Sequence, residues 1–139
     1  EIFLLTRARG LARRLGPAKL LALGGAAAML RWTVIAAEPS LPVLFAVQTL
    51  HAGTFACAYL GAIEFLDRAA PLRLVNTGMT LMSTTGVGAM TGLATVVAGF
   101  VWNSHGAGPA YMMMAAMGAV SLLLAVLLMR AWDGKKLFD

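Results

Sequence analysis

Residues Pro42 to Leu66 read PVLFAVQTLHAGTFACAYLGAIEFL, a long apolar run with few polar side chains. It exceeds the roughly 20 mostly apolar residues that cross a bilayer as a helix. Three further windows share this character, and the four together are residues 17–37, 42–66, 77–102 and 109–130. Pro17, Pro42 and Pro109 stand near the starts of three windows, where a helix tolerates proline. The sequence therefore predicts an all-α membrane protein with four transmembrane helices.

The composition supports the same class of protein and excludes several others. Of the 139 residues, 60% are hydrophobic and 12% are charged, and the mean hydropathy is +0.80. Soluble domains are about half apolar and a quarter charged. The basic residues are separated by long apolar runs without interleaved aromatic residues, which argues against nucleic acid as a partner.

Chemistry at a metal or nucleophile is not indicated. Cys57 is the only cysteine, so the chain can form neither an internal disulfide nor a thiolate metal site. His51 and His105 lie in different segments, which argues against a histidine metal cluster. No nucleophile–base set and no phosphate-binding loop is visible, and we expect no enzyme activity and no cofactor.

The basic residues also predict how the chain is oriented. Five lie before or at the start of the first span, two follow the second, and three lie at the end of the fourth or after it, which places ten of the eleven on one side. Short loops rich in Lys and Arg remain in the cytoplasm. We expect residues 17–130 to form the transmembrane region and residues 131–139 a cytoplasmic tail. Residues 1–16 are expected to hold the end of a truncated helix and a basic cytoplasmic loop, since EIFLL resembles a last helical turn.

One face of the second span carries polar and aromatic side chains. Gln48, His51, Phe55, Tyr59 and Ala62 are three or four residues apart and form one stripe on a helix. Polar side chains at this depth are costly and are often functional. The stripe forms a cavity wall that binds substrate, with an imidazole that can change its protonation. Alternatively, His51 is a neutral histidine bonded to a neighbouring helix.

Two charged residues lie inside the spans. Arg31 either extends to the interface or is buried opposite a carboxylate, and it is a further candidate for substrate binding. Glu64 is expected to pair with Arg68 one helical turn later.

The third span is rich in small and hydroxyl-bearing residues. Gly88 and Gly92 form a GxxxG pair, a spacing that lets helix backbones approach closely. The predicted helix-packing residues are Gly86, Gly88, Gly92 and Gly99.

The segments LARRLGPAKLLALGGAAAMLRW, VQTLHAGTFACAYLGAIEFL and TGMTLMSTTGVGAMTGLATVVAGFVW resemble the last third of a major facilitator superfamily transporter. The branch they resemble contains phenylpropionate porters and sugar and nucleoside proton symporters. The resemblance implies helices 9 to 12 of a twelve-helix fold. His51 matches a histidine of galactoside-type symporters, and Thr54 stands where those proteins have a carboxylate. A coupling acid would then come from elsewhere, for instance from Glu1 or from the missing helices.

The resemblance implies the C-terminal part of a secondary active transporter in a bacterial inner membrane. It would move a small organic solute of the aromatic acid, sugar or nucleoside type by alternating access, with coupling to protons. Its partners would be the solute, protons, the lipid bilayer and the missing N-terminal helices. The alternative is a self-standing four-helix membrane protein that acts by helix association, or a small multidrug-type exporter. That exporter class needs a carboxylate deep in its first span, and this first span has none.

Overall fold

The computed structural model describes residues 14–137, and the elements in this range are all helical. The expected truncated helix and the candidate acid Glu1 lie outside the described residues. α2 spans Pro17–Ala36, α3 spans Leu41–Ala69 and α6 spans Ala107–Ala131. Between α3 and α6 runs one long rod, which consists of α4 (Leu72–Leu81), the π-helical segment η1 (Met82–Ala89) and α5 (Met90–His105). We call this rod, Leu72–His105, the third span.

Four helical stretches are long and apolar enough to cross a membrane, namely Pro17–Ala36, Leu41–Ala69, Leu72–His105 and Ala107–Ala131. The predicted fold class is therefore confirmed. A chain in a bilayer forms such helices because they satisfy every backbone hydrogen bond within one segment. The helices extend a few residues beyond the apolar windows 42–66 and 77–102. The additional turns at their ends include polar and charged residues, which the hydropathy windows leave out.

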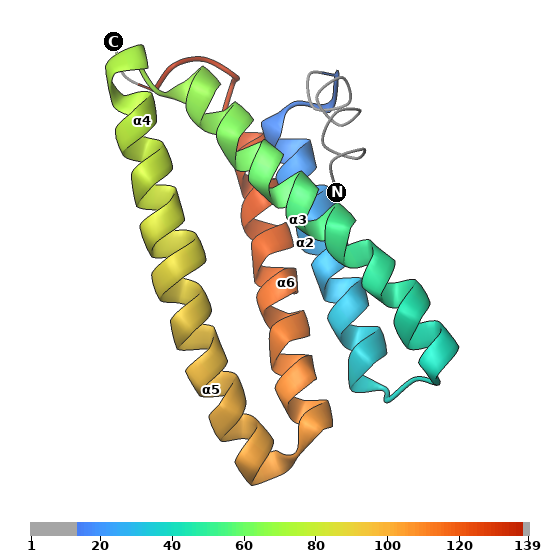
Figure 1. Ribbon diagram of the computed structural model, residues 1–139. Helices are drawn as coiled ribbons and strands as arrows, with labels where there is room; N and C mark the ends of the chain where they lie inside the picture. The colour runs from blue at the N-terminus through green and yellow to red at the C-terminus, as the bar shows by residue number, and fades with distance from the viewer. Residues whose placement is uncertain (1–13, 138–139) are drawn as a thin grey trace.

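Short connections set the antiparallel order of the spans (Figure 1). The α2–α3 turn is closed by the Glu38 amide, which donates to the Ile35 carbonyl at 3.0 Å. Between α5 and α6 the chain turns at Gly106, whose φ of 88° suits a residue without a side chain. Both turns lie at the end of the molecule opposite the chain's C-terminal tail (Figure 1).

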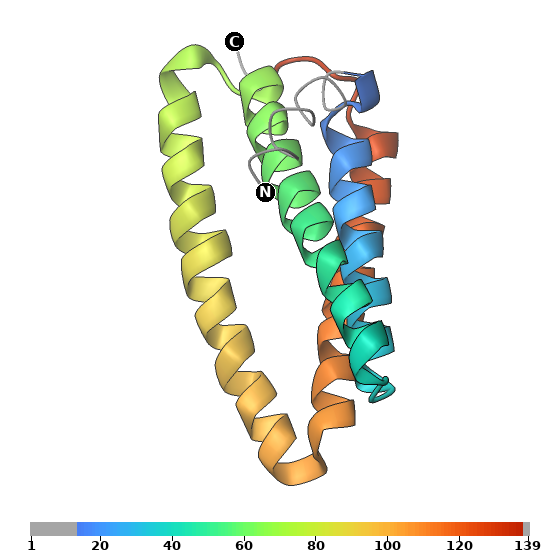
Figure 2. The ribbon, with the colours of Figure 1, turned by 45° about the vertical axis from the view of Figure 1, so that its right-hand side comes forward.

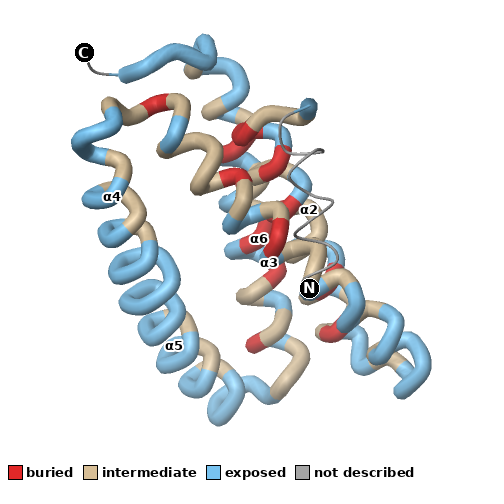
Figure 3. Tube along the Cα trace, turned by 45° about the horizontal axis from the view of Figure 1, so that its top comes forward, coloured by how far each residue is buried: buried red, intermediate tan, exposed pale blue. Residues whose placement is uncertain are grey.

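The packed part of the structure is α2 together with α6 and α3 (Figure 3). Glycines let these helices approach closely. A Cβ on Gly25 would lie 2.7 Å from the Leu122 backbone nitrogen, and one on Gly118 would lie 2.7 Å from that of Met29. Gly24 faces Ala58 of α3 in the same way, at 3.1 Å. The α2–α6 and α2–α3 interfaces are therefore backbone-to-backbone contacts of the kind that small residues permit in membranes.

The third span stands apart from this packed part. It contacts α3 near their connection and α6 near the other end, and the two rods diverge between these points (Figures 1 and 2). None of the residues in α4, η1 or α5 is buried. One side of α3 and one side of the third span are therefore left open toward each other.

The tail after α6 folds back onto the end of α3. The Trp132 ring meets the Phe65 ring edge-on with 4.9 Å between centroids, and the Leu137 amide donates to the Ala69 carbonyl at 2.8 Å. The described basic residues other than Arg31 lie at or near the ends of the spans on this side of the molecule, and they are Arg14, Lys19, Arg68, Arg73, Arg130, Lys135 and Lys136.

Candidate functional site

The polar and aromatic stripe of α3 faces away from the packed part of the structure. Gln48, His51, Phe55 and Tyr59 are all exposed, whereas Ala56 and Gly61 of the opposite face are buried. The segregation follows from size, because only small residues allow α3 to approach α2 closely. The Phe55 and Tyr59 rings stack nearly parallel, with 5.7 Å between centroids and 8° between planes. The four side chains thus share one open surface, and their role in binding stays a prediction.

Arg31 lies inside the chain and not at its surface. Its exposed fraction is 7%, and its Nη1 donates to Oε1 of Gln48 at 3.3 Å. The guanidinium carbon lies 4.1 Å from the centre of the Trp32 ring, and Nε has no hydrogen-bond partner among the described residues. Of the two expectations for Arg31, burial holds. Its described partner, however, is an amide and not a carboxylate.

The Arg31–Gln48 hydrogen bond joins α2 to the open face of α3. It places a fixed positive charge behind the stripe, at the level of Gln48. A charge at membrane depth is expensive unless it is partnered or reaches water. The neighbourhood of Gln48 is therefore the charged end of the open surface.

Glu64 does not contribute to this surface. Its Oε1 accepts from Nη2 of Arg68 at 2.6 Å and from Nε at 3.0 Å. The expected pair one helical turn apart is confirmed. His105 lies at the end of α5, where its Nδ1 is 2.7 Å from the Ser104 hydroxyl oxygen.

Two adjoining cavities lie between α3 and the third span, and we call them together the α3–η1 groove. One has a volume of about 310 Å³ and the other about 350 Å³. They share Tyr59 and Met82. The remaining lining residues are Phe55, Ala58, Ala62, Gly86, Val87 and Thr91 in the first, and Met79, Thr80, Ser83 and Thr84 in the second.

The sequence predicts Phe55 and Tyr59 on this surface, but it does not predict the residues of the third span that line the other side of the groove. Ser83, Thr84 and Thr91 belong to the span that was interpreted as a packing helix. The signal was present as the hydroxyl run STT at residues 83–85. Its placement depends on how the third span is rotated, which the sequence pattern does not define.

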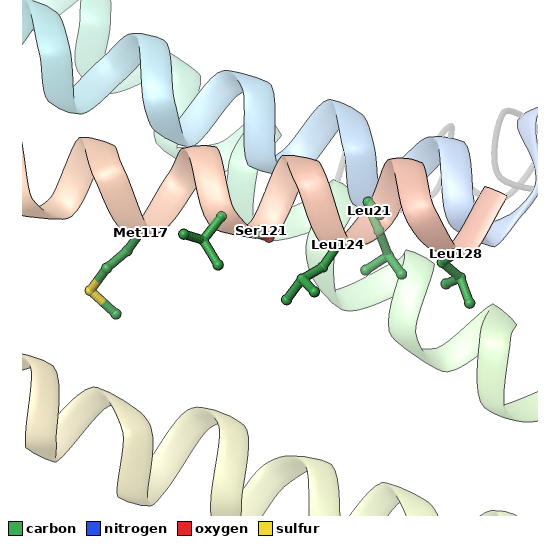
Figure 4. A pocket seen from close by; sticks show the side chains of 7 residues that line it. Leu21, Met117, Ser121, Leu124 and Leu128 are labelled. Carbon is green, nitrogen blue, oxygen red and sulfur yellow. The ribbon is translucent and has the colours of Figure 1, made fainter. Parts of the chain in front are cut away.

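The other cavities suit a polar solute less well. One of them, with a volume of about 360 Å³, is lined by Ser121 and otherwise by apolar side chains of α2 and α6, which point toward the third span (Figure 4). A cavity of about 290 Å³ near the α5–α6 turn is walled by aromatic rings. There Tyr111 stacks on Trp32 at 5.7 Å and meets Trp102 edge-on at 5.6 Å. These surfaces match lipid or further helices better than a solute with hydrogen-bonding groups.

The predicted helix-packing glycines have no close neighbour among the described residues. A Cβ on Gly86, Gly92 or Gly99 would meet nothing within 4 Å, and one on Gly88 would meet only the Ser83 carbonyl at 3.6 Å. Their packing role stays a prediction about groups outside the described chain. Gly24, Gly25, Gly61 and Gly118 face a neighbouring helix closely and were not predicted as packing residues.

Comparisons with known proteins agree on one family. The model of the "MFS_1 like family" matches residues 1–113. The chain is 27% identical to the "Probable 3-phenylpropionic acid transporter" of Escherichia coli (strain K12) over 113 residues. This match covers 81% of this chain and 30% of that protein. It is also 27% identical to the "Maltose permease" of Geobacillus stearothermophilus over 115 residues. This match covers 83% of this chain and 29% of that protein. The chain thus spans less than a third of each relative. No solved structure matches it significantly.

Proposed function

Because this chain belongs to the MFS_1 like family, within the major facilitator superfamily, we propose that it forms part of a secondary transporter for a small organic solute. It is a multi-pass membrane protein, and its relatives are named as a transporter and a permease, not as enzymes. The solute is proposed to bind at the open surface of α3.

The observation that carries the proposal is the contrast between the two faces of α3. One face packs on α2 through small residues, whereas the other presents an imidazole and two aromatic rings to an open surface, with the Gln48 amide bonded to Arg31 at one end. In hydrocarbon such polar groups need a partner or water. A solute cavity supplies both, and pockets of this type combine apolar walls with a few polar groups.

Each residue of the surface has a distinct proposed role. Gln48 and His51 hydrogen-bond to polar groups of the solute. Phe55 and Tyr59 pack on its apolar body, and Arg31 supplies a fixed charge behind Gln48. The proposed transport cycle alternates access to this site between two halves of a larger protein.

Proton coupling is part of the proposal. His51 supplies an imidazole that can accept and release a proton. Thr54 donates to the Leu50 carbonyl at 3.0 Å and carries no acidic group, so the coupling carboxylate would come from elsewhere. The proposed location is the bacterial inner membrane, with the end that carries the basic residues in the cytoplasm.

The test is uptake by the full-length polypeptide that contains this chain, in membrane vesicles with an imposed proton gradient. 3-Phenylpropionic acid and maltose are the first solutes, because the relatives are named for them. His51→Ala should lower uptake about tenfold, the loss expected when a hydrogen bond of about 1.4 kcal/mol is removed. His105→Ala is the matched control. Equal uptake by both variants, at equal amounts in the membrane, would remove His51 from the site.

A further inference from the structure

An apolar groove along α6 ends at the basic end of the molecule. The cavity of about 360 Å³ extends from Met117 to Leu128, and Leu21 of α2 completes its wall. Its side chains point into the open space toward the third span (Figure 4). Met117 and Leu124 are exposed in the described chain, so the surface is open to whatever lies beside α6. We call this cavity the α6 groove.

The α6 groove has the length of one membrane leaflet. Met117 and Leu128 are eleven residues apart, which is about 16 Å along a helix. Half of the hydrocarbon core of a bilayer is about 15 Å thick. Because α6 spans Ala107–Ala131, the groove begins within one turn of the helix end and reaches the middle of the span. A single acyl chain of the leaflet at that end therefore matches it.

The tail after α6 places positive charges beside the end of the groove. The Trp132 amide donates to the Leu128 carbonyl at 2.9 Å, and the Trp132 ring Nε1 donates to the Lys135 carbonyl at 2.7 Å. These bonds keep Lys135 and Lys136 close to the helix end. Lys135 Nζ lies 3.4 Å from Oδ2 of Asp133, whereas Lys136 forms no ion pair with any described residue.

A second part of the chain adds charge at the same end. The Leu137 amide donates to the Ala69 carbonyl at 2.8 Å, which ties the tail to the connection between α3 and α4. Arg73 follows four residues after Ala69 and is exposed. Lys and Arg side chains at a membrane surface attract the headgroups of anionic lipids.

We infer that the α6 groove and the tail together bind one anionic phospholipid, with an acyl chain along α6 and the phosphate at Lys135 and Lys136. A further helix of the same polypeptide would cover the apolar side chains but would not use the lysines at their end. A small soluble anion would use the lysines but not the groove. A phospholipid uses both, and this binding is independent of the proposed solute and of transport.

The test compares lipids with the purified full-length polypeptide in detergent. The probes are phosphatidylglycerol and phosphatidylcholine with identical acyl chains, and glycerol 1-phosphate as a headgroup without chains. Native mass spectrometry counts the lipids retained, and thermal stabilisation reports their affinity. Phosphatidylglycerol should bind about fivefold more tightly than phosphatidylcholine, and glycerol 1-phosphate should not stabilise the protein. Equal binding of the two lipids, or equal stabilisation by glycerol 1-phosphate, would overturn the inference.

Two lysine variants separate a defined site from general attraction to a basic surface. Lys136→Gln should weaken binding of phosphatidylglycerol about fivefold. Lys19→Gln removes the same charge at the same end of the molecule. Lys19 is exposed and lies about 200° around α2 from the groove residue Leu21, so its loss should leave binding unchanged. Equal losses in both variants would overturn the site.

Two neighbouring positions of α6 test the acyl chain. Leu124→Trp fills the groove and should reduce the phosphatidylglycerol retained, whereas Leu123→Trp adds the same ring outside the lining and should not. Unchanged retention in a folded Leu124→Trp variant would mean that something other than lipid occupies the groove, and would overturn the inference. If Leu124→Trp does not fold, the comparison of Lys136→Gln with Lys19→Gln decides. No uptake assay enters this test, so its result does not depend on the proposed transport function.

Discussion

The close contact of α2 with α6 gives a sharp prediction about stability. Gly25 of α2 faces the backbone of Leu122 in α6, and Gly118 of α6 faces the backbone of Met29 in α2. Met29 lies one helical turn after Gly25, and Leu122 lies one turn after Gly118. A Cβ on either glycine would lie 2.7 Å from a backbone nitrogen, well inside the 3.4 Å at which ordinary contact begins. Backbone atoms cannot rotate away as a side chain can, so Gly25→Ala or Gly118→Ala must push the helices apart.

The size of the effect follows from the packing that this separation removes. A gap of about 0.5–1 Å forfeits roughly a quarter to a half of the dispersion energy of each contact. Overpacked interiors lose about 1–3 kcal/mol, and we expect ~2 kcal/mol for each variant. In detergent micelles the melting temperature should fall by roughly 5 °C. One separation accommodates both side chains, so the double variant should cost less than the sum of the two single variants.

A matched control tests whether the close approach is the cause. Gly53 of α3 is also helical, and a Cβ there meets nothing within 4 Å. Gly53→Ala should therefore be neutral or stabilising, by up to ~1 kcal/mol from helix propensity. Melting of Gly25→Ala and Gly118→Ala at or above the temperature of the unchanged protein would refute the reasoning.

Three further predictions concern the end of the molecule where the basic residues gather. Trp132→Ala should release the tail from α3, and faster trypsin cleavage after the tail lysines would show it. Glu64→Gln should lower the melting temperature only slightly, because its partly exposed pair with Arg68 is worth about 0.3–0.5 kcal/mol. Orientation can be tested in inside-out vesicles of a variant without native cysteines. Lys136→Cys should react there with a membrane-impermeant maleimide, and His105→Cys should not. The reverse result would invert the proposed orientation.

The sequence predicted the helices well and their packing poorly, for physical reasons. Hydropathy locates the spans because a bilayer forces each apolar stretch into a helix. It does not show which face of a helix meets which neighbour. The sequence therefore does not identify the Gly24–Gly25 pair as a packing site. The predicted packing residues Gly88 and Gly92 meet no neighbouring helix among the described residues. The π-helical form of η1 likewise has no sequence pattern of its own.

The candidate site was predictable to the extent that it lies on one helix. The three- and four-residue spacing of the α3 stripe gathered Gln48, His51, Phe55 and Tyr59 from periodicity alone. The hydrogen bond from Arg31 to Gln48 joins two spans, and the wall formed by η1 belongs to a third. Both depend on how helices are rotated about their axes, which a single helical pattern does not contain.

The open surface of α3 is divided along its length by charge. Arg31 and Gln48 lie at one end, and Tyr59, which faces the η1 hydroxyls, lies eleven residues further along the helix, at about 16 Å. A solute whose polar groups are held by Gln48 and His51 therefore lies beside the fixed charge of Arg31, and its apolar body extends toward Phe55 and Tyr59. Arg31→Gln should weaken binding of 3-phenylpropionic acid about tenfold and leave an uncharged glycoside unaffected, because only the acid gains from a fixed positive charge.

The two solutes act as controls for each other, and ligand-dependent thermal stabilisation of the purified full-length polypeptide reports the binding of both. Equal losses for the acid and the glycoside in Arg31→Gln would contradict the role of the fixed charge, because they would mean that Arg31 serves only to join α2 to α3 through Gln48.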